Sequence, residues 1–407
     1  MRNTARALCR KRLRDAAIKM KKEFLNRIRA EIDLDAAEKN FTALKGFLYD
    51  GFTKPACVIK ADGYGHGDLR LMELYQDLGA DFFCVSNIEE ALRLRNGGCK
   101  GDILILGWSS PEDADVLAEN NIIAAAVSRE HAEAFSQKAS KPVRVHIKID
   151  TGMGRVGLNA DDAEKCAELI AEIAAMPNIS IDGVFTHFAA ADSRLDADIT
   201  YTEEQKQKFL AVVNLSERHG VKFNQIHFLN SAATVYSYDS RSTLARLGIM
   251  LYGLRPAYAL HIPVALKPVM SLKTVVSHVK TIHKGDSVSY GRTYTAKGDE
   301  VVATVPCGYA DGYPRQLSGN CTAIIRGKRA KGIGRICMDQ MMFNVTGIDG
   351  VSAGDEVILI GSDGNESITA DDLAEACGTI GYEIVCGISK RVPRVYKGGG
   401  KSVGDDE

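Results

Sequence analysis

The sequence lacks the features that mark membrane, secreted and nucleic-acid-binding proteins. No apolar run approaches the roughly 20 residues that a helix needs to cross a bilayer, and the ten cysteines include no Cys-x-x-Cys spacing. The net charge of −1 argues against binding of nucleic acid or a membrane surface by the body of the chain. Because unpaired thiols persist in reducing compartments, we expect a cytoplasmic protein without a metal site.

Charge is uneven only at the start of the chain. Residues 1–30 contain eleven lysines and arginines but two acidic residues, and no apolar segment long enough for a secretory signal. A transit peptide or an arm for an anionic surface would have this composition. We favour a simpler interpretation, a mobile extension or a true translation start at Met20. The Gly-rich, charged residues 398–407 are expected to form a disordered tail.

What the sequence does contain is a regular alternation of short apolar runs and helical stretches. Runs typical of buried strands recur eight times, at residues 56–59, 82–85, 103–106, 122–127, 143–149, 181–186, 225–228 and 243–248. The segments between them, such as 88–94 and 160–176, carry apolar residues at helical spacing. Eight strands that alternate with helices predict a closed (β/α)₈ TIM-like barrel over residues 31–265. A doubly wound open sheet is the alternative.

After about residue 265 the pattern changes to short β-type runs separated by turns. Such runs lie at residues 269–279, 301–305, 321–325 and 357–360. One helix is expected, at residues 369–377, because Thr369 suits an N-cap and acidic residues follow it. We therefore predict an α/β protein whose barrel is followed by a C-terminal mainly-β domain over residues 266–397.

Lys60 is the first candidate for chemistry, because it directly follows the apolar run at residues 56–59. A lysine at the end of a barrel strand lies at the mouth where barrel active sites are found. Burial would lower the pKa of its ammonium, and Schiff-base chemistry requires such a lysine. Three nearby glycines allow the backbone to wrap closely around a ligand. A lysine at a strand end can equally point to solvent, so its position alone does not show that Lys60 has a chemical role.

The segment Gly-Met-Gly-Arg-Val-Gly at residues 152–157 matches a dinucleotide-binding fingerprint, which would indicate an NAD-dependent oxidoreductase. The match is weak, because two residues separate the preceding strand from the first glycine. Arg155 inside the loop and Lys148 on the strand are more informative. An arginine at a barrel mouth can bind a carboxylate through two parallel hydrogen bonds.

Several other residues are ambiguous when taken one by one. His187 ends a strand, Ser231 follows the next one, and Arg246 precedes a loop at Gly248 where barrels often hold phosphate. In the β domain, Tyr290 lies beside a glycine, and a tyrosine of lowered pKa can act as a general acid or base. Each of these residues also has an ordinary structural explanation.

Taken together, these segments resemble the alanine racemase family over about residues 30–397. The motifs VIKADGYGHG, KIDTGMGRVG, THF, LNSAA, ARLGIMLYG, VSYGRTY, GYADGYPR, RICMDQ, GYE and RVPRVY stand in the family's order. The resemblance implies a pyridoxal 5′-phosphate (PLP) enzyme that works as a homodimer with shared active sites. Lys60 is expected to carry PLP as a Schiff base and to act as one catalytic base, with Tyr290 of the partner subunit as the other.

The resemblance also implies roles for the remaining residues. Arg246 would contact the pyridine nitrogen without giving up a proton, and His187 would bridge Arg246 and Tyr290. The other cofactor contacts, mostly to the phosphate, would come from Tyr64, Ser231, Gly248, Ile249 and Tyr382. The substrate would be bound by Arg155, Met338 and Tyr309, with support from Asp339 and from Lys148, which is carbamylated in many members.

We therefore expect interconversion of L-alanine and D-alanine, which in bacteria would supply cell-wall peptidoglycan. Tyr382 matches the tyrosine that limits the side-chain pocket to a methyl group, an effect worth roughly 1–3 kcal/mol. The nearest alternative is a serine or broad-specificity racemase of the same family. A PLP decarboxylase of the same fold, a PLP-carrier protein and an NAD oxidoreductase are the more distant ones.

Overall fold

The computed structural model describes residues 27–48, 51–257 and 261–399. Most of the expected basic extension and disordered tail lies outside these residues. The chain divides into two compact units, Ala36–Lys267 and a second made of Met1–Asp35 with Pro268–Glu407. None of the helices in the described ranges combines the length and the apolar character needed to span a bilayer.

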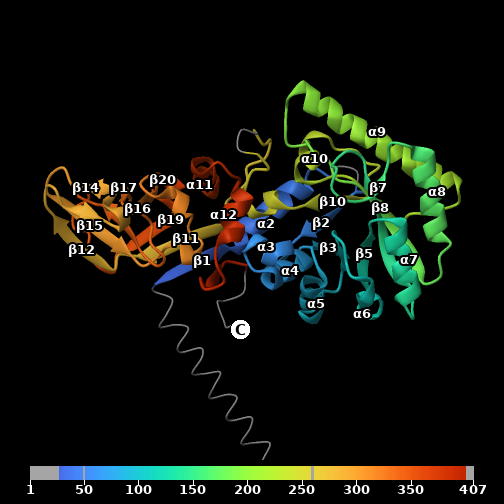
Figure 1. Cartoon of the computed structure of the whole chain (residues 1–407), viewed down its shortest axis with the longest axis horizontal. Helices are drawn as coiled ribbons and strands as arrows, with labels where there is room; N and C mark the ends of the chain where they lie inside the picture. Colours follow the sequence, from blue (N-terminus) through green and yellow to red (C-terminus); the bar gives the residue numbers. More distant parts are fainter. Residues whose placement is uncertain (1–26, 49–50, 258–260, 400–407) are drawn as a thin grey trace, which may run out of the picture. The chain divides into compact units, whose positions relative to one another are not determined.

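The first unit is built on eight parallel strands in the order β10-β2-β3-β4-β5-β6-β8-β9 (Figure 1). Their bounds are β2 (Lys54–Val58), β3 (Phe82–Val85), β4 (Asp102–Ile105), β5 (Ile122–Ala126), β6 (Val143–Asp150), β8 (Ile179–Phe185), β9 (Gln225–His227) and β10 (Leu244–Leu247). The two outer strands approach each other through a bridge between Leu229 and Ala245. The predicted barrel is therefore confirmed, nearly closed, rather than an open sheet.

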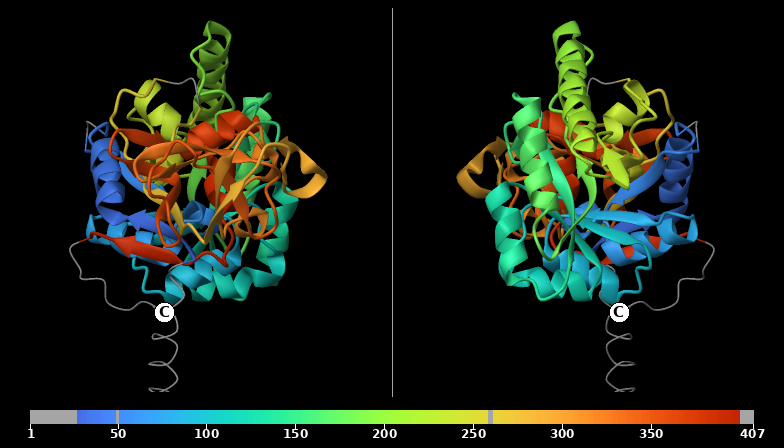
Figure 2. Two further views of the ribbon diagram at one scale, coloured as in Figure 1. Left: turned by 90° about the vertical axis from the view of Figure 1, so that its left-hand side faces the viewer. Right: turned by 90° about the vertical axis from the view of Figure 1, so that its right-hand side faces the viewer.

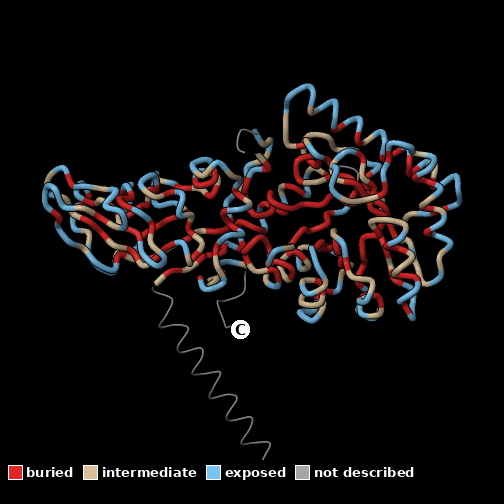
Figure 3. The backbone as a smooth tube through the Cα atoms, viewed as in Figure 1, coloured by how far each residue is buried: buried red, intermediate tan, exposed pale blue. Residues whose placement is uncertain are grey.

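Helices cover the barrel strands on the outside (Figure 2, right panel). They are α2 (Leu34–Lys45), α3 (Lys60–Tyr64), α4 (Asp68–Asp77), α5 (Ile88–Asn96), α6 (Ala114–Glu119), α7 (Arg129–Lys138), α8 (Ala163–Ala174), α9 (Asp196–Arg218) and α10 (Ser231–Tyr236). The local sequence sets several starting points: Asn87 caps α5 by accepting from the Glu90 amide, and Asp162 caps α8. Such a cap is worth about 1 kcal/mol. Figure 3 shows buried strands in the interior and exposed outer helix faces.

The second unit contains a ten-stranded sheet in the order β12-β15-β18-β17-β16-β19-β11-β1-β21, with β20 paired to β19. The strands are β1 (Ile28–Asp33), β11 (Met270–Val275), β12 (His278–Ile282), β15 (Glu300–Val305), β16 (Thr322–Ile325), β17 (Lys328–Ile333), β18 (Met341–Asn344), β19 (Glu356–Asp363), β20 (Glu366–Ile368) and β21 (Arg394–Lys397). Strand β1 pairs with β11 and β21, so residues 28–33 belong to this sheet and not to the barrel.

The expected helix of the second unit is present as α11 (Ala370–Cys377), with Thr369 and Asp372 forming a reciprocal cap. A second helix, α12 (Gly381–Gly387), was not expected. Two short strands, β13 (Ser287–Val288) and β14 (Tyr294–Thr295), pair with each other and flank the turn that carries Tyr290.

A buried carboxylate ties the first described residue of the chain to the β unit. Asp311 is fully buried and accepts hydrogen bonds from Arg27 Nη1 and Nη2 at 2.9 and 2.8 Å and from the Gly308 amide at 3.0 Å. Arg391 Nε lies 3.1 Å from Asp311 Oδ1. A buried charge needs such partners, because its desolvation is costly.

We expect Arg27→Met to lower the free energy of unfolding by about 1–3 kcal/mol, because it removes two of these hydrogen bonds from a buried charge. Urea denaturation of the full chain measures the change. Arg329→Met is the matched control, since it removes an exposed pair with Glu366 that is worth at most about 1 kcal/mol. Equal effects of the two substitutions would contradict the prediction.

Candidate active site

Lys60 lies where the sequence places it, two residues beyond the carboxyl end of β2. The strand ends at Val58, and the Ile59 amide still donates to Cys84 O on β3 at 3.0 Å. Lys60 is half-buried. Active sites of (β/α)₈ barrels lie at this end of the strands.

Directly after Lys60 the backbone makes a left-handed helical turn. Residues 61–64 have φ values of +53°, +55°, +59° and +52°, although only Gly63 lacks a side chain. Left-handed conformation costs a residue with a Cβ roughly 1–2 kcal/mol. The turn is held by the Gly63 amide on Ile59 O at 2.9 Å and the Ala61 amide on Glu90 Oε1 at 2.8 Å. Strain of this kind persists at functional sites, where the surrounding structure enforces it.

The turn buries Tyr64 and aims its hydroxyl at Gly248. A Cβ built on Gly248 would lie 3.1 Å from Tyr64 Oη and 3.7 Å from Ser231 Oγ. The Gly248 amide itself donates to Ser231 Oγ at 2.8 Å. Ile249, which is buried, follows at the start of a short helical turn, Ile249–Tyr252. Two hydroxyls and the backbone after β10 thus converge from three loops, a donor set that suits a phosphate.

Arg246 is buried on β10 with its terminal nitrogens occupied. Nη1 donates to His227 Nδ1 at 2.8 Å and His227 O at 3.0 Å, and Nη2 donates to Thr186 O at 2.7 Å and His187 Nδ1 at 3.4 Å. Burial lowers the pKa of Arg246 to about 10, so the side chain stays charged at neutral pH. Among the described residues, the Nε–H has no hydrogen-bond acceptor. It is therefore the donor that Arg246 can offer to a ligand.

His187 contacts Arg246, as expected from the sequence. Burial, reinforced by the nearby charge of Arg246, lowers the pKa of His187 well below its ordinary value. The ring is therefore neutral at pH 7. Because an arginine can only donate, His187 Nδ1 accepts from it and the proton of the ring lies on Nε2.

Lys148 lies on β6 and is 2% exposed, with Nζ donating to Ile149 O at 3.0 Å. Burial lowers the pKa of Lys148 to about 7, helped by the positive charges of Arg246 and Arg155. Arg155 itself is exposed. The structure thus gives Lys148 an amine that is partly neutral at physiological pH.

The Gly-rich loop before Arg155 is organised around a carboxylate. Asp150 accepts from the amides of Gly152, Gly154 and Arg155 at 3.0, 3.1 and 3.1 Å. A dinucleotide fingerprint offers such amides to a pyrophosphate. Here they are occupied by Asp150, which argues against the NAD interpretation of the loop.

The remaining expected residues lie in the β unit, where three of them are exposed: Tyr290 by 71%, Tyr309 by 41% and Met338 by 53%. Their loops are joined, since the Tyr309 amide donates to Cys337 O at 3.1 Å and Ser289 Oγ donates to Arg335 O at 2.6 Å.

Two supporting residues of the same unit have clear local settings. Asp339, next to Met338, accepts from Arg391 Nη2 at 2.8 Å. Tyr382 is half-buried at the start of α12.

His227, which holds Arg246, was missed by the sequence analysis, as was His146 on β6. The sequence of β6 contains a signal for such buried polar residues. Parallel strands buried on both faces read as continuous apolar runs, whereas β6 reads Val-Arg-Val-His-Ile-Lys-Ile-Asp. The polar residues at alternate positions predict a polar column inside the barrel.

Comparison with known proteins identifies the family. The family model of the alanine racemase N-terminal domain matches residues 32–256, and that of the alanine racemase C-terminal domain matches residues 269–396. The chain is 41% identical to an alanine racemase from Desulfovibrio desulfuricans over 370 residues, 90% of this chain and 97% of the relative. It is 40% identical to an alanine racemase from Halothermothrix orenii, with 90% and 96% covered.

A solved structure agrees with both the fold and the sequence match. The crystal structure of alanine racemase from Bacillus anthracis with bound L-Ala-P superposes with a TM-score of 0.87 at 36% identity, covering 93% of this chain and 97% of that one. Two family models and these relatives span both units of the fold. The chain therefore belongs to the alanine racemase family.

Proposed function

We propose that this chain is a PLP-dependent racemase that interconverts L-alanine and D-alanine. The observation that carries the proposal is the set of groups at the mouth of the barrel. Lys60 stands at the end of β2, hydroxyl and amide groups converge near Gly248, and a buried arginine keeps its Nε–H available. These groups match the aldehyde, the phosphate and the ring nitrogen of PLP respectively.

The residues of this chain fit PLP in distinct roles. Lys60 would hold its aldehyde carbon, and Tyr64, Ser231, Gly248 and Ile249, together with Tyr382, would hold its phosphate. Arg246 would donate to the ring nitrogen without releasing a proton, because a guanidinium remains charged. When bound, PLP supplies an electron sink that makes the Cα proton of an amino acid removable.

The chain's own residues would then bind the substrate and move two protons. Arg155, the Met338 amide and Tyr309 bind the substrate, with Lys148 and Asp339 in support. Tyr290 Oη takes the Cα proton of L-alanine on one face, and Lys60 Nζ delivers a proton on the other. In the reverse direction the two groups exchange roles. His187, neutral and bonded to Arg246, would bridge Arg246 and Tyr290.

We propose that the active unit is a homodimer in which each site takes Tyr290 from the partner subunit. The exposure of Tyr290, Tyr309 and Met338 supports this arrangement, because three residues with expected site roles are exposed on hydrogen-bonded loops of the β unit. D-Alanine made by the enzyme would supply peptidoglycan synthesis in the cytoplasm.

The test is a chiral assay of purified protein supplied with PLP and a panel of L-amino acids. We expect D-alanine to form, and borohydride to fix the cofactor on the peptide that contains Lys60. Formation of carbon dioxide and an amine, or no reaction with any amino acid, would refute the proposal.

Tyr382 bears on the choice between alanine and serine. We expect Tyr382→Asn to raise the ratio of kcat/KM for serine to that for alanine by about 10-fold to 100-fold, since one pocket contact is worth roughly 1–3 kcal/mol. The assay uses saturating PLP, because Tyr382 is also proposed to contact the phosphate. Tyr382→Phe preserves the size of the ring and should stay selective for alanine. An unchanged ratio in the asparagine variant would show that another residue sets the pocket.

Lys148 is proposed to carry a carbamate. Its neutral amine attacks the carbon of CO₂, and the displaced proton leaves to solvent, so a neutral amine is replaced by an anion beside two arginines. With ¹³C-labelled bicarbonate, NMR should detect one protein carbamate signal that grows between pH 6 and 8, as the amine with a pKa of about 7 becomes neutral. Lys148→Gln should lack the signal; persistence in that variant would assign it elsewhere.

The same pKa predicts how unmodified Lys148 affects stability. Its ordinary value is 10.5 and its folded value is about 7. Between these values the unfolded chain binds more protons than the folded one, so the free energy of unfolding contributed by Lys148 rises with pH in this window. Urea titrations without bicarbonate should show a steeper rise from pH 7 to 9 in the native sequence than in Lys148→Gln.

A further inference from the structure

Strand β6 places three polar side chains on one face of a buried strand. Arg144, His146 and Lys148 occupy alternate positions and so point to the same side. His146 is fully buried, and a polar group there requires partners. Lys148 belongs to the site described above, whereas His146 does not.

A hydrogen-bonded chain of fixed direction joins His146 to Arg246. Arg246 Nη1 lies 2.8 Å from His227 Nδ1, and His227 Nε2 lies 2.8 Å from His146 Nδ1. Because arginine only donates, His227 Nδ1 must accept, and a neutral His227 carries its proton on Nε2. That proton is donated to His146 Nδ1. His146 must therefore carry its own proton on Nε2.

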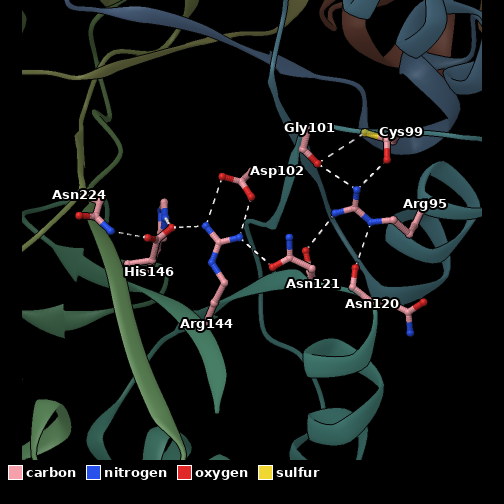
Figure 4. Close-up of polar contacts among 10 residues, drawn as sticks. Arg95, Cys99, Gly101, Asp102, Asn120, Asn121, Arg144, His146 and Asn224 are labelled. Carbon is pink, nitrogen blue, oxygen red and sulfur yellow. Dashed lines mark hydrogen bonds and ion pairs between the residues drawn. The ribbon is translucent and has the colours of Figure 1, made fainter. Parts of the chain in front are cut away.

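The chain ends at a carboxylate. His146 Nε2 lies 3.5 Å from Asp182 Oδ2, an electrostatic contact beyond ordinary hydrogen-bond length. Asp182 also accepts from Arg144 Nη2 at 2.7 Å and from Asn224 Nδ2 at 2.9 Å. Figure 4 shows Arg144 with Asp102 on one side and with His146 and Asn224 on the other. The contact with His146, with Asn224 and Arg144 beside it, keeps the pKa of Asp182 well below its usual range.

The backbone of β8 is adapted to this contact. Its register with β6 pairs Val145 with Ile181 and then His146 with Gly183, so Asp182 is an extra residue in a bulge. Bulges redirect side chains and are common beside active sites. A Cβ on Gly183 would lie 2.8 Å from His146 Nε2, so the glycine leaves room for the imidazole.

We propose that His227, His146 and Asp182 are positioning residues that fix the orientation of Arg246. The carboxylate sets the tautomer of His146, and His146 sets that of His227. The His227 ring then offers Arg246 an acceptor at Nδ1 only, beside the His227 backbone oxygen. With Thr186 O holding the other terminal nitrogen, Nε–H remains as the donor for the cofactor ring. The inference rests on the proposed function in one respect, that the ligand contacted by Arg246 is PLP.

Cofactor affinity tests the proposal on the full chain freed of PLP and titrated with PLP. His146→Leu should weaken PLP binding by about 10-fold, the size typical when an outer partner of a ligating residue is lost. His146→Gln, which can accept and donate, should recover part of that loss. Phe82→Leu is the packing control, because its ring lies 5.9 Å from His146 and 6.5 Å from His227 without joining the chain. Equal losses in His146→Leu and Phe82→Leu, or no loss, would overturn the proposal.

A second readout does not depend on PLP. NMR of the chain labelled with ¹⁵N-histidine should show His146 and His227 as neutral rings protonated on Nε2 at pH 7. In His146→Leu the His227 signal should shift, because its N–H loses an acceptor. A native His227 protonated on Nδ1 would overturn the proposal even if PLP binds. If the protein binds no PLP at all, the proposed function fails, while these tautomers still decide whether the chain of contacts exists.

Discussion

Lys60→Ala should lower the rate of alanine racemisation by at least about 10⁴-fold in both directions. Removal of a positioned acid–base group alone costs about 10²–10⁴-fold, and this substitution also removes the proposed anchor of PLP. A chiral assay started from each enantiomer at saturating PLP measures the effect. The kcat/KM values for the two directions fall equally, because the two enantiomers have the same free energy.

The structure explains why no neighbouring group should replace this lysine. Residues 61–64 adopt left-handed conformation, and their turn is fixed by hydrogen bonds to Ile59 O and Glu90 Oε1. The strained backbone sets the position of the Lys60 Cα relative to Tyr64 and Gly248. A group that acts on a reacting atom must reach it within hydrogen-bond distance, and the turn leaves little freedom for another residue to do so.

Lys54→Ala provides the matched control. Lys54 begins the same strand β2 and pairs with Asp81 at 2.7 Å, with 58% of its side chain exposed. Loss of such a pair changes stability by at most about 1 kcal/mol, so this variant should racemise alanine at the native rate. Native activity in Lys60→Ala would refute the central assignment of the site.

The barrel could be predicted from the sequence because most of its strands are short apolar runs bounded by polar loops. The final run, at residues 243–248, is interrupted by Arg246. The structure nevertheless places β10 there, with Arg246 bonded to His227 and Thr186 O. Arg246 departs from the apolar pattern of a buried strand, and it belongs to the candidate active site.

Pairings between distant segments could not be predicted. Strand β1 at Ile28–Asp33 joins β11, some 240 residues later, and β21 near the end of the described chain. Local propensity says nothing about which sheet a strand enters. Strands β17 and β18 were not predicted for a different reason. Their alternation of polar and apolar residues is too short to be distinguished from a loop.

Within the candidate site, residue identities were predictable and their physical states were not. The family motifs named Lys148 and His187, but the pKa of Lys148 depends on its burial and on two arginines brought together by folding. The left-handed turn after Lys60 has a single glycine among its four residues, so its residue types do not predict left-handed backbone. His227 was identified only by its contact with Arg246, and His146 only by its contact with His227, although the polar alternation of β6 includes His146.

Tyr290→Phe should lower kcat/KM for both enantiomers by about 10²–10⁴-fold while PLP still binds. The substitution removes only the phenolic oxygen of an exposed side chain, so the fold should be retained. Hydrogen exchange at Cα in D₂O separates the two proposed bases. D-Alanine, deprotonated by Lys60, should still exchange, whereas exchange of L-alanine should be lost.

Tyr294→Phe is the control for this variant. Tyr294 lies four residues further along the same segment, and its hydroxyl donates to Glu300 Oε2 at 2.5 Å within the β unit. Its removal should leave racemisation intact. Equal loss of exchange for both enantiomers in Tyr290→Phe would show that the tyrosine supports the site without acting as a face-specific base.

Mixing the two inactive variants tests whether the site is shared between subunits. In a dimer of one Lys60→Ala chain and one Tyr290→Phe chain, one site receives both substitutions and the other receives neither. Random reassociation of equal amounts makes half of the dimers mixed, so about a quarter of the native activity should return. If Lys60 and Tyr290 served a site within one chain, every site would carry a substitution and no activity would return. Activity measured against mixing ratio should peak at equal amounts, since mixed dimers are most abundant there.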